Sequence, residues 1–360
     1  MRAAARVGCG AAMVAASLGF ALLVAELGVR LHQWGHGRAF LDDVPFLIRD
    51  DRLGWRPNGP LKVERVLADA AGTVYRARVT TAVHGFRRFP QVAAGKPRIL
   101  LIGDSFTHAV EVDDERTYHA LLARRQPDHE VFAIGAGGYG TLQEALLLER
   151  SYPLVRPAIV IWQLCANDLT NNLFEAERHS VRHNNLMRRP YWEQGEIVVR
   201  HPAPWPLAAM EHLHRITGLR LLDVLRDRAY RVLAMLGDRT DPDGFGDADG
   251  PALRARAIAV TEAILSRSRA RHPHSRFLSL NVCGSAEEGA ILRAISEASG
   301  FHFLGDYGSR IADRRRPGFE VFSEDGHHFN EHGHALLATM LADDFDRWRE
   351  GDAIGIAHAH

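Results

Sequence analysis

Short, largely apolar runs alternate with longer amphipathic stretches along most of the chain. The apolar runs have the length and composition of strands buried on both faces, and they cover residues 98–102, 130–134, 158–164, 276–282 and 301–304. Helical spacing predicts helices over residues 115–125, 141–152, 251–271 and 331–349, and another that begins at residue 285. Strands alternating with helices of this length predict a parallel sheet that is covered by helices on both faces.

Three of the predicted helices begin with capping signals. Thr141 with Glu144, and Ser285 with Glu288, have the spacing of a capping box. Asn330 stands directly before the last predicted helix, where an asparagine side chain can accept hydrogen bonds from the first free N–H groups. We therefore expect helices to begin at these three places.

The alternation stops over residues 171–250, which we predict to be a cap-like insertion in one α/β domain of residues 97–350. The first part of the insertion is rich in Asn, Arg, His and Trp and predicts a hairpin around Gln194-Gly195. Residues 207–236 predict one or two amphipathic helices, and an Asp- and Gly-rich loop follows them. The insertion is expected to lie over the sheet.

Two further segments precede and follow this domain. Residues 31–96 contain scattered turn signals and two β-rich pieces, so they predict an irregular, β-containing prelude to the domain. Residues 351–360 are predicted to be a flexible tail.

An uncharged run of nineteen residues, 7–25, lies close to the N-terminus and follows Arg2 and Arg6. A helix needs about 20 apolar residues to cross a bilayer, so residues 1–30 predict a cytoplasmic N-terminus and an uncleaved transmembrane anchor. The two arginines predict that the rest of the chain lies outside the cytoplasm, in the periplasm or the extracellular space. A cleaved signal peptide and a buried hydrophobic helix are the alternatives, although Leu23 makes the best cleavage site a poor one.

Composition and charge favour a globular protein with small-molecule partners. Hydrophobic residues make up 46% of the chain and charged residues 24%, which excludes a disordered or low-complexity protein. The 44 basic and 44 acidic residues cancel, so no basic stripe argues for nucleic-acid binding. Three cysteines, Cys9, Cys165 and Cys283, are too few for a disulfide scaffold and lack the spacing of a zinc site.

The residues that follow the predicted strands carry the candidate chemistry, because ligands bind beyond the carboxyl ends of strands in a parallel sheet. The first strand is followed by Gly103-Asp104-Ser105, where a glycine turn can present the serine hydroxyl to a pocket. Thr107 excludes a nucleophile elbow of the G-x-S-x-G kind. The third strand is followed by Asn167, whose neutral amide can donate to an oxyanion.

A glycine-rich turn, GAGGYG over residues 135–140, follows the second strand. It matches the dinucleotide fingerprint G-x-G-x-x-G in form. A dinucleotide site is disfavoured because the turn follows the second strand of the series and because no acidic residue ends the next strand. The turn exposes backbone N–H groups, so Gly138 is a candidate oxyanion donor.

A loop with a carboxylate and two histidines precedes the last helix. Asp325 and His328 stand three residues apart, so the carboxylate can fix one imidazole nitrogen and leave the other to act as a base. His328 and His332 have the spacing of a helical metal pair, but no third ligand is apparent and Asn330 interrupts the helix between them. We interpret His332 and His334 as surface or capping residues.

Together, these four blocks resemble the SGNH hydrolase family, also called GDSL-type esterases. The matching residues are Ser105 in GDSF, Gly138 in GGYGT, Asn167 in ANDL, and Asp325 with His328 in DGHHFN. The resemblance covers residues 97–175 and 253–349. It implies a flavodoxin-like, three-layer α/β sandwich with a five-stranded parallel sheet. Departures from the family pattern occur at three positions, Ala133, Cys165 and Phe329.

The resemblance also implies a serine esterase or acylhydrolase that needs no metal or organic cofactor. In this interpretation Ser105 is the nucleophile, His328 the base and Asp325 its partner, while Ser105, Gly138 and Asn167 form the oxyanion hole. Asp104 and Asp168 are interpreted as structural residues that hold their turns.

The sequence leaves the substrate and two other activities open. The substrate is expected to be a small-molecule, glycan or lipid ester, such as an O-acetyl or a lipid acyl ester. Transfer of the acyl group to an extracytoplasmic glycan would make the protein an O-acyltransferase. A non-catalytic, membrane-tethered binding module is disfavoured because Ser105, Asn167, Asp325 and His328 are all present.

Overall fold

The computed structural model describes residues 2–35, 46–91, 95–180, 182–236, 243–245 and 250–357. The chain divides into two compact units, which are considered separately below. The first comprises Met1–Pro45 and Ala203–Asp238, and the second comprises Phe46–Pro202 and Arg239–His360.

A central sheet of five parallel strands organises the second unit. The strands are β5 (Arg98–Gly103), β6 (Glu130–Gly135), β7 (Ile159–Leu164), β10 (Arg276–Asn281) and β11 (His302–Asp306). Their spatial order is β6-β5-β7-β10-β11, which is 2-1-3-4-5 in chain order and therefore flavodoxin-like. Gly103 pairs with Gly135, and Ile102 pairs with Trp162, so three strands end at one edge. The sheet predicted from the sequence is confirmed.

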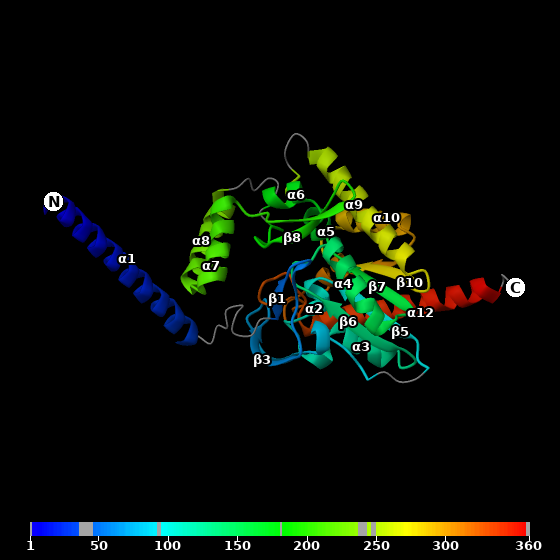
Figure 1. Ribbon diagram of the computed structural model, residues 1–360. Coiled ribbons are helices and arrows are strands. Elements are labelled where there is room, and N and C mark those ends of the chain that lie inside the picture. The colour runs from blue at the N-terminus through cyan, green and yellow to red at the C-terminus, as the bar shows by residue number, and fades with distance from the viewer. Residues whose placement is uncertain are drawn as a thin grey trace. The chain divides into compact units, whose positions relative to one another are not determined.

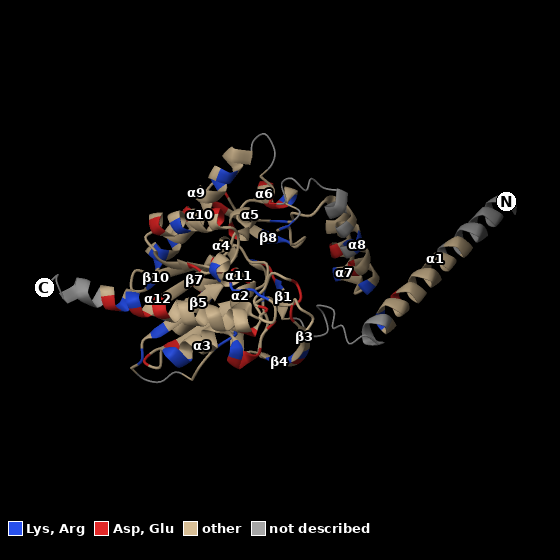
Figure 2. Cartoon of the chain, turned by 180° about the vertical axis from the view of Figure 1, so that it is seen from behind, with Lys and Arg blue, Asp and Glu red and all other residues tan. Residues whose placement is uncertain are grey.

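Helices cover both faces of this sheet, as Figure 1 shows. Leu100 and Ile102 of β5 face one hydrophobic core, while Ile99 and Leu101 face the other. The first core is closed by α4 (Thr141–Val155), α9 (Gly250–Arg271) and α10 (Ala286–Ala298). The second is closed by α3 (Tyr118–Arg125), α11 (Gly308–Ala312) and α12 (Glu331–Ala357). Figure 2 shows both signs of charge along α9, α10 and α12. The predicted three-layer sandwich is confirmed.

The predicted capping signals have different outcomes. Ser285 and Glu288 form the predicted capping box at α10. Asn330 Oδ1 accepts the N–H groups of His332 and Gly333, so it caps α12 as predicted. The capping box of Thr141 and Glu144 is wrong, because α4 has no side-chain cap.

Glu144 explains this failure, since its side chain is fully buried against the sheet. Its carboxylate accepts the indole N–H of Trp162 at 2.5 Å and does not turn back to the helix N-terminus.

The last helix, α12, continues to Ala357 and therefore enters the segment that was predicted to be a tail.

The prelude forms two small antiparallel hairpins in the second unit. They consist of β1 (Leu47–Asp50) with β2 (Gly54–Pro57), and of β3 (Leu61–Ala68) with β4 (Val74–Thr81), followed by a short 3₁₀ turn at Val83–Gly85. Leu53 and Trp55 are buried in the core that α4 closes. The first hairpin is therefore integrated with the sheet domain.

Part of the insertion also belongs to the second unit. It comprises α6 (Phe174–His179) and the hairpin of β8 (Arg189–Glu193) with β9 (Glu196–Arg200), and the short helix α5 (Asn167–Asn171) leads into it. The hairpin is confirmed, and its turn residues Gln194 and Gly195 both have left-handed φ values.

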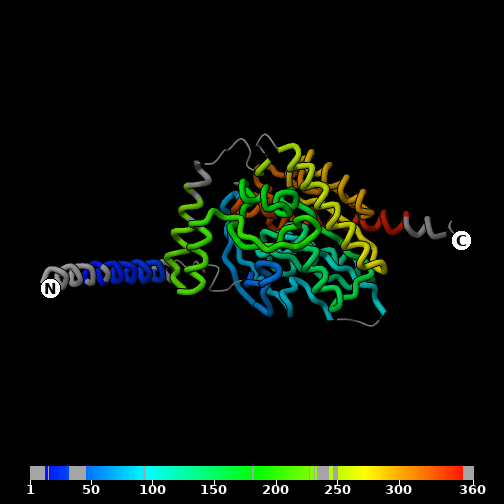
Figure 3. The backbone as a smooth tube through the Cα atoms, turned by 45° about the horizontal axis from the view of Figure 1, so that its top comes forward, coloured from blue at the N-terminus to red at the C-terminus, as the bar shows by residue number. Residues whose placement is uncertain are grey.

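The described part of the first unit contains three helices: α1 (Arg2–Gly35), α7 (Trp205–Thr217) and α8 (Arg220–Leu236). Two helices over this segment agree with the prediction of one or two, and Figures 1 and 3 show α7 and α8 side by side as a helical hairpin. Glu26 of α1 accepts the N–H groups of Arg220 and Leu221, at 3.1 and 2.8 Å, so it caps the start of α8.

The transmembrane anchor predicted within residues 1–30 is not supported. The helix α1 is present, but no helix among the described residues is long and apolar enough to cross a membrane. Of the predicted span, the side chains of residues 7–12 and of Ala15 lie outside the described part of the structure.

Candidate active site

Ser105 stands at the carboxyl edge of the sheet, at the start of the short helix α2 (Ser105–His108). The carboxylate of Asp104 accepts the N–H of Phe106 at 2.9 Å and so caps this helix. The last residue of β5, Gly103, has no room for a side chain, because a Cβ atom there would lie 2.3 Å from the side-chain oxygen of Gln163. The tight turn places Ser105 beyond the end of β5.

A hydrogen-bonded chain joins Ser105 to the loop before α12. His328 Nε2 lies 2.7 Å from Ser105 Oγ, and His328 Nδ1 lies 2.5 Å from a carboxylate oxygen of Asp325. The other carboxylate oxygen accepts the backbone N–H groups of His327 and His328, at 2.9 Å each. A proton on Nδ1 satisfies Asp325 and leaves Nε2 free to accept the serine proton.

The candidate catalytic groups meet where the sheet topology reverses. The strand order changes direction between β5 and β7, and ligands bind at such a switch point in open α/β sheets. Ser105 follows β5, Gly138 follows β6, Asn167 follows β7, and the loop before α12 adds His328. The chain therefore has a flavodoxin-like fold, and three of the four blocks that resemble the SGNH hydrolase family follow strands that end at one edge of its sheet.

Three solved structures of esterases or lipolytic proteins resemble this chain at low sequence identity. The psychrotrophic esterase EstA from Pseudoalteromonas sp. is 13% identical, with 71% of this chain and 100% of that chain covered and a TM-score of 0.41. A member of the lipolytic G-D-S-L family from Veillonella parvula is 11% identical, with 69% and 98% covered and a TM-score of 0.36. A family 3 carbohydrate esterase from Clostridium thermocellum is 13% identical, with 71% and 98% covered and a TM-score of 0.35. No protein-family model and no curated protein matches the chain.

Asn167 contacts the glycine turn that contains Gly138. Gly138 has a φ of +74°, which favours glycine, and its N–H has no acceptor among the described residues. The amide nitrogen of Asn167 donates to the carbonyl of Tyr139 at 2.8 Å and to Asn171 Oδ1 at 3.0 Å. Asn167 therefore holds the glycine turn, and an oxyanion would have to replace one of its two acceptors.

The other histidines of the C-terminal loop take separate places. The exposed His327 packs edge-on against Phe106 and His328, with ring centroids 5.4 and 5.0 Å apart. His332 is exposed, as predicted, and its Nδ1 lies 3.0 Å from the carbonyl of Glu320. His334 is buried, so its interpretation as a surface residue is wrong. It stacks on Tyr118, and burial lowers the pKa of His334 to about 3.

Metal ligation gains no geometric support from these histidines. Among the residues that the structure describes, no group of three or more His, Cys, Asp and Glu side chains is placed to hold a metal ion.

Two buried carboxyl groups, Asp104 and Asp168, hold the turns that follow β5 and β7. Asp168 accepts the N–H of Cys165 at 3.0 Å, so Asp104 and Asp168 both make the turn-holding hydrogen bonds predicted from the sequence. Burial raises the pKa of Asp104 to about 6. Burial also raises the pKa of Asp168, and the negative charge of Asp104 adds to this effect. These acids therefore support the turns as buried, hydrogen-bonded groups.

A disulfide, which the cysteine spacing does not predict, joins Cys165 and Cys283 at the ends of β7 and β10. The two residues are 118 positions apart in the sequence, so no local motif pairs them. The N–H of Ala166 also donates to the sulfur of Cys283 at 3.2 Å, next to Asn167. Disulfides persist in oxidising compartments, which agrees with the predicted location outside the cytoplasm. That location stays a prediction.

The charge state of His328 sets the expected pH dependence. Burial alone would lower the pKa of His328. The hydrogen bond to Asp325 and the negative charges of Glu111, Asp325 and Asp104 outweigh burial and raise the pKa to about 9. Hydrogen bonds from His328 and from two backbone N–H groups, working against burial, hold the pKa of Asp325 well below its usual range.

We expect kcat/KM for an ester to rise about tenfold per pH unit below the pKa of His328, because a base must be neutral to accept a proton. The rise should level off near pH 9. Glu111→Gln removes one of the charges that stabilise the imidazolium, so the rising limb should move to lower pH. The exposed Glu115→Gln is the matched control, and its limb should stay in place. A Glu111→Gln profile identical to that of the wild type would contradict this electrostatic account.

Proposed function

We propose that this protein is a serine hydrolase that cleaves carboxylic esters through an acyl-enzyme. The contact that carries the proposal is the chain from Ser105 Oγ through the His328 ring to Asp325, with heavy-atom distances of 2.7 and 2.5 Å. Such spacing is that of a nucleophile, a base and an orienting carboxylate. Its place at the topological switch point adds independent support.

In the first half-reaction, Ser105 Oγ attacks the ester carbonyl carbon while His328 Nε2 accepts the hydroxyl proton. The carbonyl oxygen becomes an oxyanion, which the N–H groups of Ser105 and Gly138 and the amide of Asn167 would stabilise. The tetrahedral intermediate collapses, His328 gives its proton to the leaving alcohol, and an acyl-serine remains. Asp325 stabilises the imidazolium throughout and keeps its own charge.

Water completes the reaction in the second half. His328 takes a proton from water, the hydroxide attacks the acyl-serine, and a second oxyanion forms in the same hole. Collapse releases the carboxylic acid and returns the proton to Ser105 Oγ. The proton and charge transfers of both half-reactions use five residues: Ser105, Gly138, Asn167, Asp325 and His328.

A covalent serine probe tests the proposal directly. A fluorophosphonate should phosphonylate Ser105, with loss of fluoride, and raise the mass of the protein by one phosphonyl group. The labelled peptide should contain residues 103–108, and labelling should remove hydrolysis of a short-chain aryl ester in proportion. A protein that hydrolyses no ester in a panel of short and long acyl chains, and that takes up no label, would contradict the proposed function.

Asn167→Ala tests the oxyanion hole. We expect kcat to fall by roughly 10² to 10³, the usual cost of losing one oxyanion donor, with a smaller effect on KM. Asn281→Ala is the matched control, since this buried amide holds another turn at the same sheet edge through Cys283 O and Asp306. Its kcat should stay within about tenfold of wild type. An Asn167→Ala variant changed in KM alone would make Asn167 a substrate-binding residue.

A further inference from the structure

Three consecutive carbonyl groups of the glycine turn accept hydrogen bonds from side chains of other segments. The indole N–H of Trp55 donates to the carbonyl of Gly137 at 2.9 Å. Arg189 Nη2 donates to the carbonyl of Gly138 at 2.6 Å, and Asn167 donates to that of Tyr139 at 2.8 Å. Trp55 belongs to the prelude and Arg189 to the insertion, so two of the donors lie outside the segments that resemble the SGNH family.

The bond from Trp55 fixes the direction of the Gly138 N–H. Gly137 and Gly138 share one trans peptide unit, in which the C=O and the N–H point in opposite directions. Because the Gly137 carbonyl points to the buried indole of Trp55, the Gly138 N–H points away from it. That N–H has no acceptor among the described residues, which leaves it available for an oxyanion.

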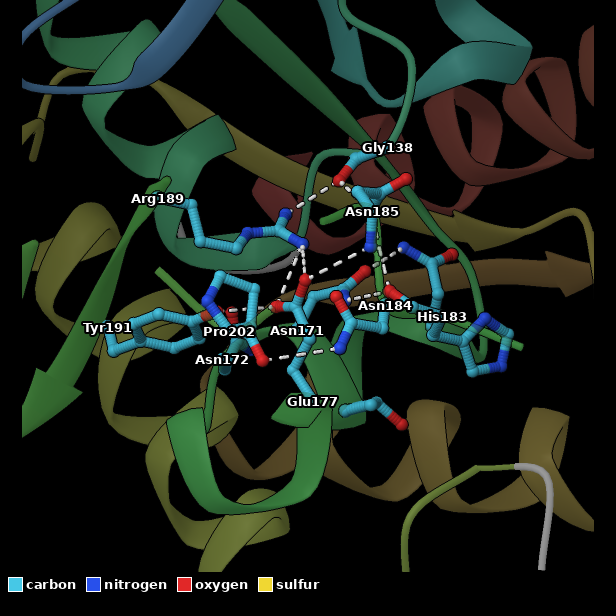
Figure 4. A network of polar contacts seen from close by, with 12 residues as sticks. Gly138, Asn171, Asn172, Glu177, His183, Asn184, Asn185, Arg189, Tyr191 and Pro202 are labelled. Atoms are coloured by element: carbon cyan, nitrogen blue, oxygen red, sulfur yellow. Dashed lines mark hydrogen bonds and ion pairs between the residues drawn. The ribbon is translucent and has the colours of Figure 1, made fainter. Parts of the chain in front are cut away.

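Arg189 locks the same turn from the insertion, as Figure 4 shows. Its side chain is fully buried, and Nη1 lies 3.0 Å from each carboxylate oxygen of Glu177. The guanidinium carbon also lies 5.1 Å from the centre of the Trp55 ring, so the two clamping side chains contact each other. The hydroxyl of Tyr139, in the glycine turn, also donates a hydrogen bond to the backbone carbonyl of Trp55 at 2.5 Å.

We propose that Trp55 and Arg189 are positioning residues for the oxyanion hole, and that they aim the Gly138 N–H at the substrate oxygen. This inference rests on the proposed ester hydrolysis and extends its machinery to the prelude and the insertion. Preorganised donors stabilise a transition state because they need no reorientation as charge develops. Without the hydrogen bonds from Trp55 and Arg189, the turn would have to reorient during the reaction. A misplacement of about 1 Å can lower a rate by 10².

Trp55→Phe is the primary test, measured in the full chain. Phenylalanine keeps most of the buried ring and its stacking on Arg189 but removes the indole N–H. We expect kcat per active site to fall by roughly 10 to 10² while KM stays within about threefold, because the bond acts on the transition state. Titration with a fluorophosphonate counts the active sites, so partial misfolding cannot imitate the loss.

A boronic acid inhibitor gives a second readout that a merely structural role would not change. Its tetrahedral adduct with Ser105 places an oxygen in the oxyanion hole, so its affinity should fall in step with kcat in Trp55→Phe. Trp192→Phe is the matched control, since Trp192 belongs to the insertion strand β8 but packs against Arg267. Its kcat and inhibitor affinity should match those of wild type.

Arg189→Lys keeps the test decisive if Trp55→Phe does not fold. Lysine keeps the positive charge beside Glu177 but lacks the fork that reaches Glu177 and the Gly138 carbonyl together. Arg189→Lys should therefore lower kcat per active site, as is expected for Trp55→Phe. Wild-type kcat per site and wild-type boronic acid affinity in the folded variants would overturn the inference. A wild-type protein that takes up no fluorophosphonate would instead overturn the proposed function.

Discussion

Ser105→Ala is expected to abolish ester hydrolysis and fluorophosphonate labelling while the protein stays folded. Loss of the nucleophile of a serine triad lowers kcat by roughly 10⁴ to 10⁶, because the remaining groups cannot form the acyl-enzyme. Ser105 is half-buried at the start of a short helix and belongs to neither hydrophobic core, so removal of its hydroxyl leaves both cores intact. Kinetics and the mass of the labelled protein together measure the effect.

A serine outside the site provides the control for this variant. Ser285 caps α10 with its hydroxyl, so Ser285→Ala should lower the free energy of unfolding by about 1 kcal/mol and leave kcat unchanged. Ser105→Ala should show the reverse, with normal stability and no turnover. Wild-type hydrolysis by folded Ser105→Ala would show that another group is the nucleophile.

The second large effect separates the adjacent histidines of the C-terminal loop. His328→Ala is expected to lower kcat/KM by roughly 10² to 10⁴, the usual contribution of a positioned general base. His327→Ala should stay within about tenfold of wild type, because its ring contacts Phe106 and His328 and makes no hydrogen bond among the described residues. Kinetics of both variants at a single pH above 9 avoids any confusion with a shifted pKa. A severe loss in His327→Ala with a nearly normal His328→Ala would reverse the assignment.

The active-site loop shows why some of these residues could be predicted from short motifs. Asp325 and His328 are three positions apart, and their hydrogen bond closes within one loop. Ser105 is predictable because the apolar run that ends at residue 102 defines where the strand stops and the edge of the sheet begins. Most of the proposed catalytic groups can therefore be identified from local spacing in the sequence.

Glu144 and His334 show where such reasoning fails. A threonine followed three residues later by a glutamate favours a capping box, but the sheet buries Glu144 and Trp162 binds its carboxylate. His334 is part of a polar loop and helix start in the sequence, yet it packs against Tyr118, which lies 216 positions away. In both cases a tertiary contact outweighs the local preference.

The sequence by itself determined the five strands, their alternation with helices and the blocks that follow the strands. Apolar periodicity and turn chemistry depend on neighbours in the chain, so these features can be read locally. The tertiary structure decided the disulfide of Cys165 with Cys283, and the clamping of the glycine turn by Trp55 and Arg189. Trp55 lies 82 positions from Gly137, and Arg189 lies 51 from Gly138. Such contacts form when folding brings distant segments together to satisfy buried carbonyl groups, and no local pattern encodes that pairing.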